Sequence, residues 1–161
     1  GRAGWLVPTR PRQEKALARD LTTGGLSFYL PCAPHRQRTR GRVYTAFKPL
    51  FPGYAFVRIS EDERNRAYAS RRIARMVPVV DQARLWHDLR QVHRILDLGQ
   101  PVTSEQLITP GSRVALRSGP LAGLTGTIIR AASGQKFVVQ VDLIQKGVAV
   151  VVDHATLGIL S

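Results

Sequence analysis

Arginine is the residue type with the clearest chemical role in this sequence, because four arginines stand at alternate positions of one short segment. Arg36, Arg38, Arg40 and Arg42 recur at every second residue of HRQRTRGRVYTAF. Side chains two residues apart lie on the same side of an extended chain, so this spacing predicts four guanidinium groups along one side of a hairpin arm. A guanidinium group presents a planar set of donors that suits phosphate oxygens.

The overall charge points to the same class of partner. The 161 residues include 24 Lys and Arg against 11 Asp and Glu, a formal net charge of +13. Residues 1–98 hold 19 of those basic side chains and 8 of the acidic ones. Such an imbalance draws a protein toward a polyanion such as nucleic acid.

The segment KPLFPGYAFVRI, residues 48–59, concentrates aromatic side chains around a Pro-Gly turn. Strand alternation places Tyr54, Phe56 and Arg58 on one side and Ala55, Val57 and Ile59 on the other. The second set is expected to enter the core. The aromatic residues either belong to a core as well or form an exposed surface for a partner, and both readings stay open at this point.

Residues for catalysis or metal binding are not grouped in the sequence. The histidines, His35, His87, His93 and His154, are scattered, and His87 and His93 are six residues apart rather than four. Cys32 is the single cysteine, which excludes an internal disulfide or a cysteine-based zinc site. We therefore expect no catalytic residues, no metal and no cofactor, and a protein that is not an enzyme. The single cysteine makes a reducing, cytoplasmic location the expected one. The longest aliphatic run is too short to cross a bilayer, so no membrane partner is expected.

The elements that must position these residues can be read from the pattern of residues 1–98. Strands are expected at residues 5–10, 26–31, 54–59 and 76–80, with Pro8 marking an edge or a bend. A first helix should follow Pro11 and end at Gly24-Gly25. Ser60 and Glu63 form a capping box that predicts a helix from about Glu61 to Ile73. An apolar stripe predicts a helix from Ala83 to Leu98.

The character of the chain changes after that helix. Residues 99–109 have no period and are expected to form a linker. Residues 110–161 contain short β-branched runs separated by turns, which predict a small β-barrel. Gly119, Gly123 and Gly126 are expected to allow turns with positive φ.

In order and spacing, WLVPTRPRQEKA, PLFPGYAFVRI and ITPGSRVALRSGPLAGLTGTIIR resemble the NusG family of transcription elongation and antitermination factors. The fold implied is α+β: a mixed α/β NusG N-terminal domain over residues 1–98, with an antiparallel sheet flanked by helices, a linker over 99–109, and a small all-β SH3-like KOW barrel over 110–161. Residues 49–52 and 142–146 resemble the specialised RfaH-type paralogues, whose barrels can refold as helices. The β-branched runs here favour strands instead.

The resemblance implies that the protein is a monomer that binds the clamp helices of the β′ subunit of RNA polymerase and suppresses pausing or termination. The apolar pocket for that contact would be formed by Trp5, Val7, Phe51, Pro52, Tyr54 and Phe56.

The resemblance also implies a basic groove for the non-template DNA strand. Its candidate residues are Arg10, Arg12, Lys15, Arg71, Arg72 and Arg75. The arginines Arg36, Arg38, Arg40 and Arg42 could equally contact upstream DNA or nascent RNA.

In the barrel, the resemblance implies a contact for NusE or for Rho. Leu143 is expected in the core, and Ile144 is the candidate for the partner contact. An alternative reading is a ribosome-associated RNA-binding protein that uses its KOW module, for which no apolar pocket would be needed.

Overall fold

The computed structural model describes residues 1–106, 112–131, 134–152 and 157–159, and it divides into two compact units. The first comprises Gly1–Cys32 and Lys48–Leu85, and the second Ala33–Phe47 and Trp86–Ser161. The predicted domain boundaries at residues 98 and 109 remain a prediction. Among the described residues, no helix is long and apolar enough to cross a membrane.

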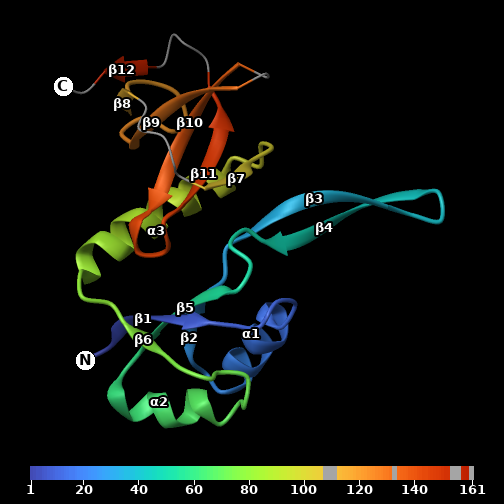
Figure 1. Cartoon of the computed structure of the whole chain (residues 1–161), viewed down its shortest axis with the longest axis vertical. Helices are drawn as coiled ribbons and strands as arrows, with labels where there is room; N and C mark the ends of the chain where they lie inside the picture. The colour runs from blue at the N-terminus through green and yellow to red at the C-terminus, as the bar shows by residue number, and fades with distance from the viewer. Residues whose placement is uncertain (107–111, 132–133, 153–156, 160–161) are drawn as a thin grey trace. The chain divides into compact units, whose positions relative to one another are not determined.

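A four-stranded antiparallel sheet organises the first unit (Figure 1). Its order is β2 (Ser27–Tyr29), β5 (Tyr54–Ile59), β1 (Ala3–Pro8) and β6 (Val77–Pro78). The strand β1 lies inside the sheet, but β6 pairs only with Trp5 and Leu6, so Pro8 has a partner strand on one side alone, in agreement with the expectation of an edge position at this residue. Proline is tolerated here because Pro8 is the last residue of β1, where the ladder ends.

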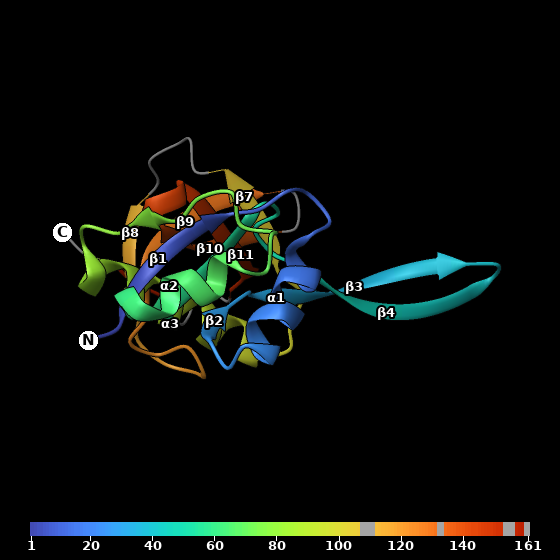
Figure 2. The same cartoon turned by 90° about the horizontal axis from the view of Figure 1, so that it is seen from below.

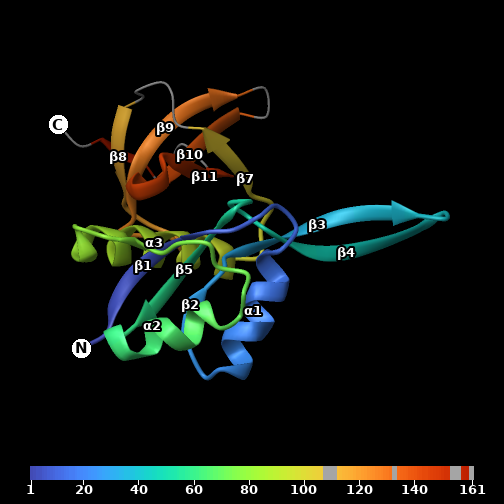
Figure 3. The ribbon, with the colours of Figure 1, turned by 60° about the horizontal axis from the view of Figure 1, so that its bottom comes forward.

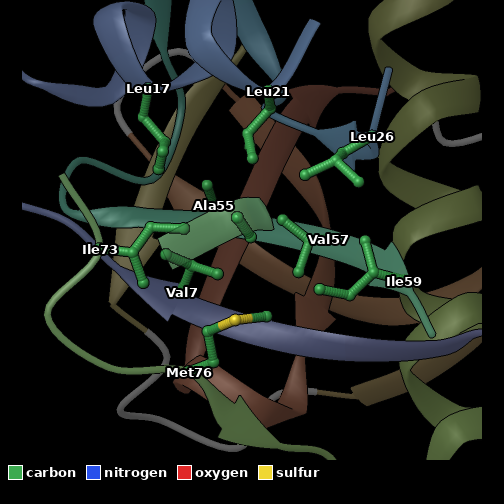
Figure 4. Packing of buried hydrophobic residues seen from close by; sticks show 10 residues of the cluster. Val7, Leu17, Leu21, Leu26, Ala55, Val57, Ile59, Ile73 and Met76 are labelled. Carbon is green, nitrogen blue, oxygen red and sulfur yellow. The ribbon is translucent and has the colours of Figure 1, made fainter. Parts of the chain in front are cut away.

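One face of this sheet carries the core of the first unit, which Figure 4 shows. Leu17 and Leu21 of α1 (Glu14–Thr23) pack against Val57 of β5 and its neighbours. The core cluster consists of Val7, Leu17, Leu21, Leu26, Ala55, Val57, Ile59, Ala67, Ile73 and Met76. The predicted burial of the alternate β5 residues is therefore confirmed, and α1 ends at Gly24 as the sequence predicted.

The second helix, α2 (Glu61–Tyr68), begins at the predicted capping box. Ser60 Oγ accepts from the Glu63 backbone N–H at 3.3 Å, and Glu63 Oε1 accepts from the Ser60 N–H at 3.0 Å. That Ser60 N–H, followed by the side chain of Arg2, holds the pKa of Glu63 below its ordinary value. The prediction of a helix to Ile73 is wrong, because the chain leaves the helix after Tyr68 and Arg71 adopts a left-handed φ of 61°.

Strands β3 (Cys32–Thr39) and β4 (Arg42–Pro49) form a two-stranded ribbon (Figure 2). They are joined by Arg40 and Gly41, whose φ values are 51° and 78°. Positive φ at both central residues is typical of a tight hairpin turn. The predicted row of four arginines is wrong at two positions: Arg36 and Arg38 lie on β3, whereas Arg40 occupies the turn and Arg42 lies on the other strand.

The second unit contains a six-stranded antiparallel sheet (Figure 3), which supports the all-β prediction for this part of the chain. The predicted runs form β8 (Ser112–Leu116), β9 (Thr125–Ala131), β10 (Gly134–Val141) and β11 (Lys146–Val151). The edge strands are β7 (Thr103–Gln106), which pairs with β11, and β12 (Leu157–Ile159), which pairs with β8. Part of the predicted linker is therefore a strand, and its last residues, 107–109, lie outside the described residues.

The glycines of this sheet have two different roles. Gly119 and Gly123 have φ values of 83° and 91°, as predicted. Gly126 has no positive φ, which corrects the prediction for that residue. A Cβ atom at position 126 would lie 2.4 Å from the Val138 carbonyl oxygen, so glycine is needed there for a close approach of two strands.

Helix α3 (Gln82–Asp97) is bonded to the sheet of the second unit by polar side chains. The Gln91 amide accepts from Thr125 N–H and donates to Thr125 C=O, each at 3.0 Å. Asp88 Oδ2 accepts from the Asp142 N–H at 3.1 Å. Both side chains are buried, and neither was expected from the apolar stripe of this helix.

Replacing Gln91 by alanine is expected to lower the free energy of unfolding of this unit by about 1–3 kcal/mol, because a backbone donor and acceptor of Thr125 lose their partner. Urea denaturation measures the change. The matched control is Arg90→Ala, since Arg90 is exposed on the same helix. Equal loss in both variants would contradict the role of the Gln91 amide.

Candidate nucleic-acid groove

A basic groove of about 690 Å³ lies in the first unit, between the end of β1 and the loop after α2. Its lining residues are Pro8, Thr9, Arg10, Pro11, Gln13, Arg71, Arg72, Ile73 and Ala74. Two sequence segments about sixty residues apart thus meet here. The groove combines Arg10 and Arg71, which the resemblance had paired, with the further candidate Arg72.

The first wall is the turn that leads from β1 into α1. Thr9 N–H donates to the Gly53 carbonyl at 2.8 Å, which ties the end of β1 to the Pro-Gly turn. Gln13 N–H donates to the Arg10 carbonyl at 3.0 Å, and Arg12 within that turn has a left-handed φ of 69°. These bonds fix the backbone of Arg10 at the rim.

The second wall is held to α1 by one arginine. Arg72 Nε donates to Asp20 Oδ2 and Arg72 Nη1 donates to Gln13 Oε1, each at 2.7 Å. Behind the two walls, Val7 and Ile73 belong to the core cluster, where Val7 is fully buried (Figure 4). The groove is therefore part of the folded framework of this unit.

The positive charge of the groove comes from Arg10 and Arg71. Arg72 is paired with Asp20, whereas no ion pair is recorded for Arg10 or Arg71 within the described part of the chain. Both are exposed, so an anion entering the groove would meet two guanidinium groups without displacing a carboxylate. The other candidates, Arg12, Lys15 and Arg75, are exposed but do not line the groove.

Loss of the Arg72 side-chain bonds to Asp20 and Gln13 is expected to affect nucleic-acid binding more than stability. Arg72→Gln should lower the free energy of unfolding by less than about 1 kcal/mol, because the Arg72–Asp20 pair is more than one-third exposed. It should weaken single-strand binding more than Arg75→Gln, which removes the same charge but leaves the Arg72 bonds intact. Denaturation and fluorescence anisotropy measure the two quantities. Equal binding by both variants would contradict a role of the Arg72 bonds in shaping the groove.

The candidates for polymerase binding do not share one face of the sheet. In the register of β1 and β5, Trp5 is opposite Val57 and Val7 is opposite Ala55, so both lie on the core face. Leu6 is opposite Phe56 and Pro8 is opposite Tyr54 on the other face. The expectation that Trp5 and Val7 join Tyr54 and Phe56 in one pocket is therefore corrected. Instead, the guanidinium carbon of Arg64 lies over the Trp5 ring, 4.7 Å from the ring centroid.

The remaining aromatic candidates differ in exposure. Phe51 and Phe56 are each 1% exposed, Tyr54 is half-buried and Pro52 is exposed. The Tyr54 N–H donates to the Phe51 carbonyl at 3.1 Å, and Gly53 between them has a φ of 89°. This is a turn with proline at its second position and glycine at its third, where only a residue tolerant of positive φ fits.

Sequence reasoning missed several residues of these sites. Leu6 shares the sheet face of Phe56, and Asp20 and Gln13 orient Arg72. The alternation of β1 could have indicated Leu6. The Arg72 partners depend on contacts over more than fifty residues, which no local pattern contains.

The other predicted contacts lie in the second unit. Arg36 and Arg38 are exposed on β3, Arg40 is in the turn and Arg42 is exposed on β4. Ile144 is half-buried in the short 3₁₀ helix Asp142–Ile144. Leu143 is 37% exposed, which corrects its assignment to the core.

No cluster of three or more His, Cys, Asp or Glu side chains that could hold a metal ion is found among the residues that the structure describes. His154 lies outside them. Burial raises the pKa of the Cys32 thiol, an effect opposed by Lys15 and reinforced by Glu14.

Comparison with known proteins decides the family. The family model described as "Transcription termination factor nusG" matches residues 5–108. The chain belongs to the NusG family. The match includes both walls of the groove and the Pro-Gly turn.

One solved structure agrees with this assignment at the level of fold. Thermotoga maritima NusG, in a structure that reports its domain interaction, is similar over 100% of this chain and 98% of its own, with 19% identity and a TM-score of 0.55. Two conformations of the MjSpt4:Spt5 complex also match. Conformation B has 15% identity and a TM-score of 0.30 over 98% of this chain and 97% of its own. Conformation A has 16% identity and a TM-score of 0.29 over 98% of each chain. No curated protein matches the sequence.

Proposed function

We propose that this NusG-family protein binds transcribing RNA polymerase and holds the displaced non-template DNA strand in the groove of Arg10 and Arg71. In this role it suppresses pausing or termination in the cytoplasm. The observation that carries the proposal is the meeting in one groove of two arginines from distant segments, neither of which forms an ion pair with a described residue, in a chain that belongs to a transcription factor family.

The groove suits a flexible single strand. Such strands are held mainly by neutralisation of their phosphates, and apolar side chains can support the bases. Arg10 and Arg71 supply the charge, while Pro8, Pro11 and Ile73 supply apolar lining. The rigid backbone of both walls reduces the entropy lost on binding.

We further propose that the Pro-Gly turn docks on the clamp helices of polymerase. Pro52 and Tyr54 form the accessible part of that surface, and buried Phe51 holds the turn through its bond to the Tyr54 N–H. Apolar anchors of this size supply much of the energy of an interface. Trp5 and Val7 are not part of this contact, because they face the core.

A pull-down with core RNA polymerase, followed by a pausing assay with the same protein, tests the proposal. The wild-type chain is expected to be retained and to shorten pauses. Retention by ribosomes but not by polymerase would favour the alternative of a ribosome-associated RNA-binding protein and would contradict the proposal.

A further inference from the structure

We propose that the β3–β4 hairpin is a separate binding site for single-stranded nucleic acid, in which one base stacks on Tyr44 while Arg40 and Arg42 contact phosphates. The hairpin is a two-stranded ribbon (Figure 2). Its arginines and Tyr44 are exposed. This site does not depend on the groove of the first unit or on polymerase docking.

Tyr44 has the properties of a preset stacking surface. Tyr44 is 45% exposed to solvent. Its hydroxyl donates to Gln37 Oε1 at 2.8 Å and accepts from Thr39 Oγ1 at 3.3 Å, so the ring is tethered across the ribbon. A ring whose orientation is already fixed loses little rotational freedom when a base stacks on it.

The hairpin brings positive charge to that ring. Tyr44 and Arg42 are two residues apart on β4 and therefore lie on the same face of the ribbon. Arg40 is at the tip, next to both strand ends. No ion pair is recorded for either arginine among the described residues, so both charges are available to phosphates.

The backbone conformation of Arg40 at the tip of the hairpin also favours a binding role. Arg40 has a φ of 51°, a position in a two-residue hairpin where asparagine or glycine is usual. A non-glycine residue with left-handed φ carries a conformational cost that is often found at binding sites. Placing a guanidinium there puts a charge at the end of the ribbon.

A single strand fits these features better than a duplex. In a duplex the faces of the bases are covered by their neighbours, whereas an unpaired base can stack on an aromatic ring. RNA and DNA single strands offer the same ring faces and phosphates, so the structure assigns their shared chemistry.

Fluorescence anisotropy of the full chain with labelled single-stranded 12-mers tests this inference. It is done in the Arg10→Gln/Arg71→Gln background, so that loss of the groove cannot explain the result. Tyr44→Leu is expected to weaken binding by about 5- to 150-fold, which corresponds to the loss of one stacked base. Tyr44→Phe should retain most of the affinity, and Thr45→Ala, on the opposite face of β4, is the matched control.

A salt titration separates the arginines from the ring. Arg40→Gln/Arg42→Gln should reduce the slope of log affinity against log salt by about 1.4, since each phosphate contact on a single strand contributes about 0.7. Tyr44→Leu should leave that slope unchanged.

The arms of the experiment have distinct meanings. Weaker binding of Tyr44→Leu to RNA and DNA 12-mers would support the site, and tighter binding of one of the two would identify its source. Unchanged affinity of Tyr44→Leu, or tighter binding of a duplex than of either single strand, would overturn the proposal. Circular dichroism of each variant confirms that the fold is retained.

Discussion

Replacing Arg10 and Arg71 together by glutamine is expected to weaken binding of single-stranded DNA by roughly 10- to 100-fold. Each guanidinium–phosphate hydrogen bond contributes about 1.5–3 kcal/mol, part of which the remaining polar side chains recover. The slope of log affinity against log salt concentration should become shallower by about 1.4, the amount expected for the loss of two phosphate contacts. Anisotropy over a series of salt concentrations measures both quantities.

The control for this experiment has the same net charge. Arg19 and Arg90 are exposed and do not line the groove, so Arg19→Gln/Arg90→Gln removes two charges elsewhere. If affinity depended on total charge alone, the two double variants would bind equally. That result would contradict a specific groove.

Tyr54→Ala is expected to weaken binding to RNA polymerase by about 30-fold, which corresponds to about 2 kcal/mol for an aromatic anchor at an interface. The chain should remain folded, because Tyr54 is half-buried and does not belong to the core cluster. Surface-immobilised polymerase measures the affinity, and thermal unfolding measures the stability.

Two further variants make that result interpretable. Tyr54→Phe keeps the ring and should keep most of the affinity. Val57→Ala removes core volume three residues further along β5 and should lower the free energy of unfolding by about 1–3 kcal/mol. The folded fraction of this variant should still bind polymerase. A Tyr54→Ala protein that unfolds like a core variant would show that Tyr54 has a structural role.

Much of the fold was predictable because its signals are local. The capping box at Ser60 and Glu63, the apolar stripe of α3 and the β-branched runs of β8 to β11 depend on residues within a few positions of one another. Alternation along β5 also assigned Ala55, Val57 and Ile59 to the core.

Two of the errors share a physical cause, since they depend on contacts between distant segments. Helix α2 ends at Tyr68 and leads into a loop whose Arg72 reaches Asp20 on α1 and Gln13 just before it. Asp88 and Gln91 are buried polar residues because backbone groups of the sheet bond them.

The candidate site was predictable in part. Family resemblance paired Arg10 with Arg71, and the structure brings both to one groove. The same resemblance grouped Trp5 and Val7 with Tyr54, and the strand register separates them. Tyr44 had no signal in the sequence alone, because its interest depends on the hydroxyl bonds to Gln37 and Thr39.

Photo-crosslinking within a transcribing complex tests the central claim most directly. Ala74 lines the groove, and p-benzoylphenylalanine at this position should crosslink to the non-template strand of the open bubble. The same reagent at Ala69, which is exposed outside the groove, should give little product with that strand. Crosslinks from position 74 to the template strand or to RNA, or none while the protein remains bound to polymerase, would contradict the account.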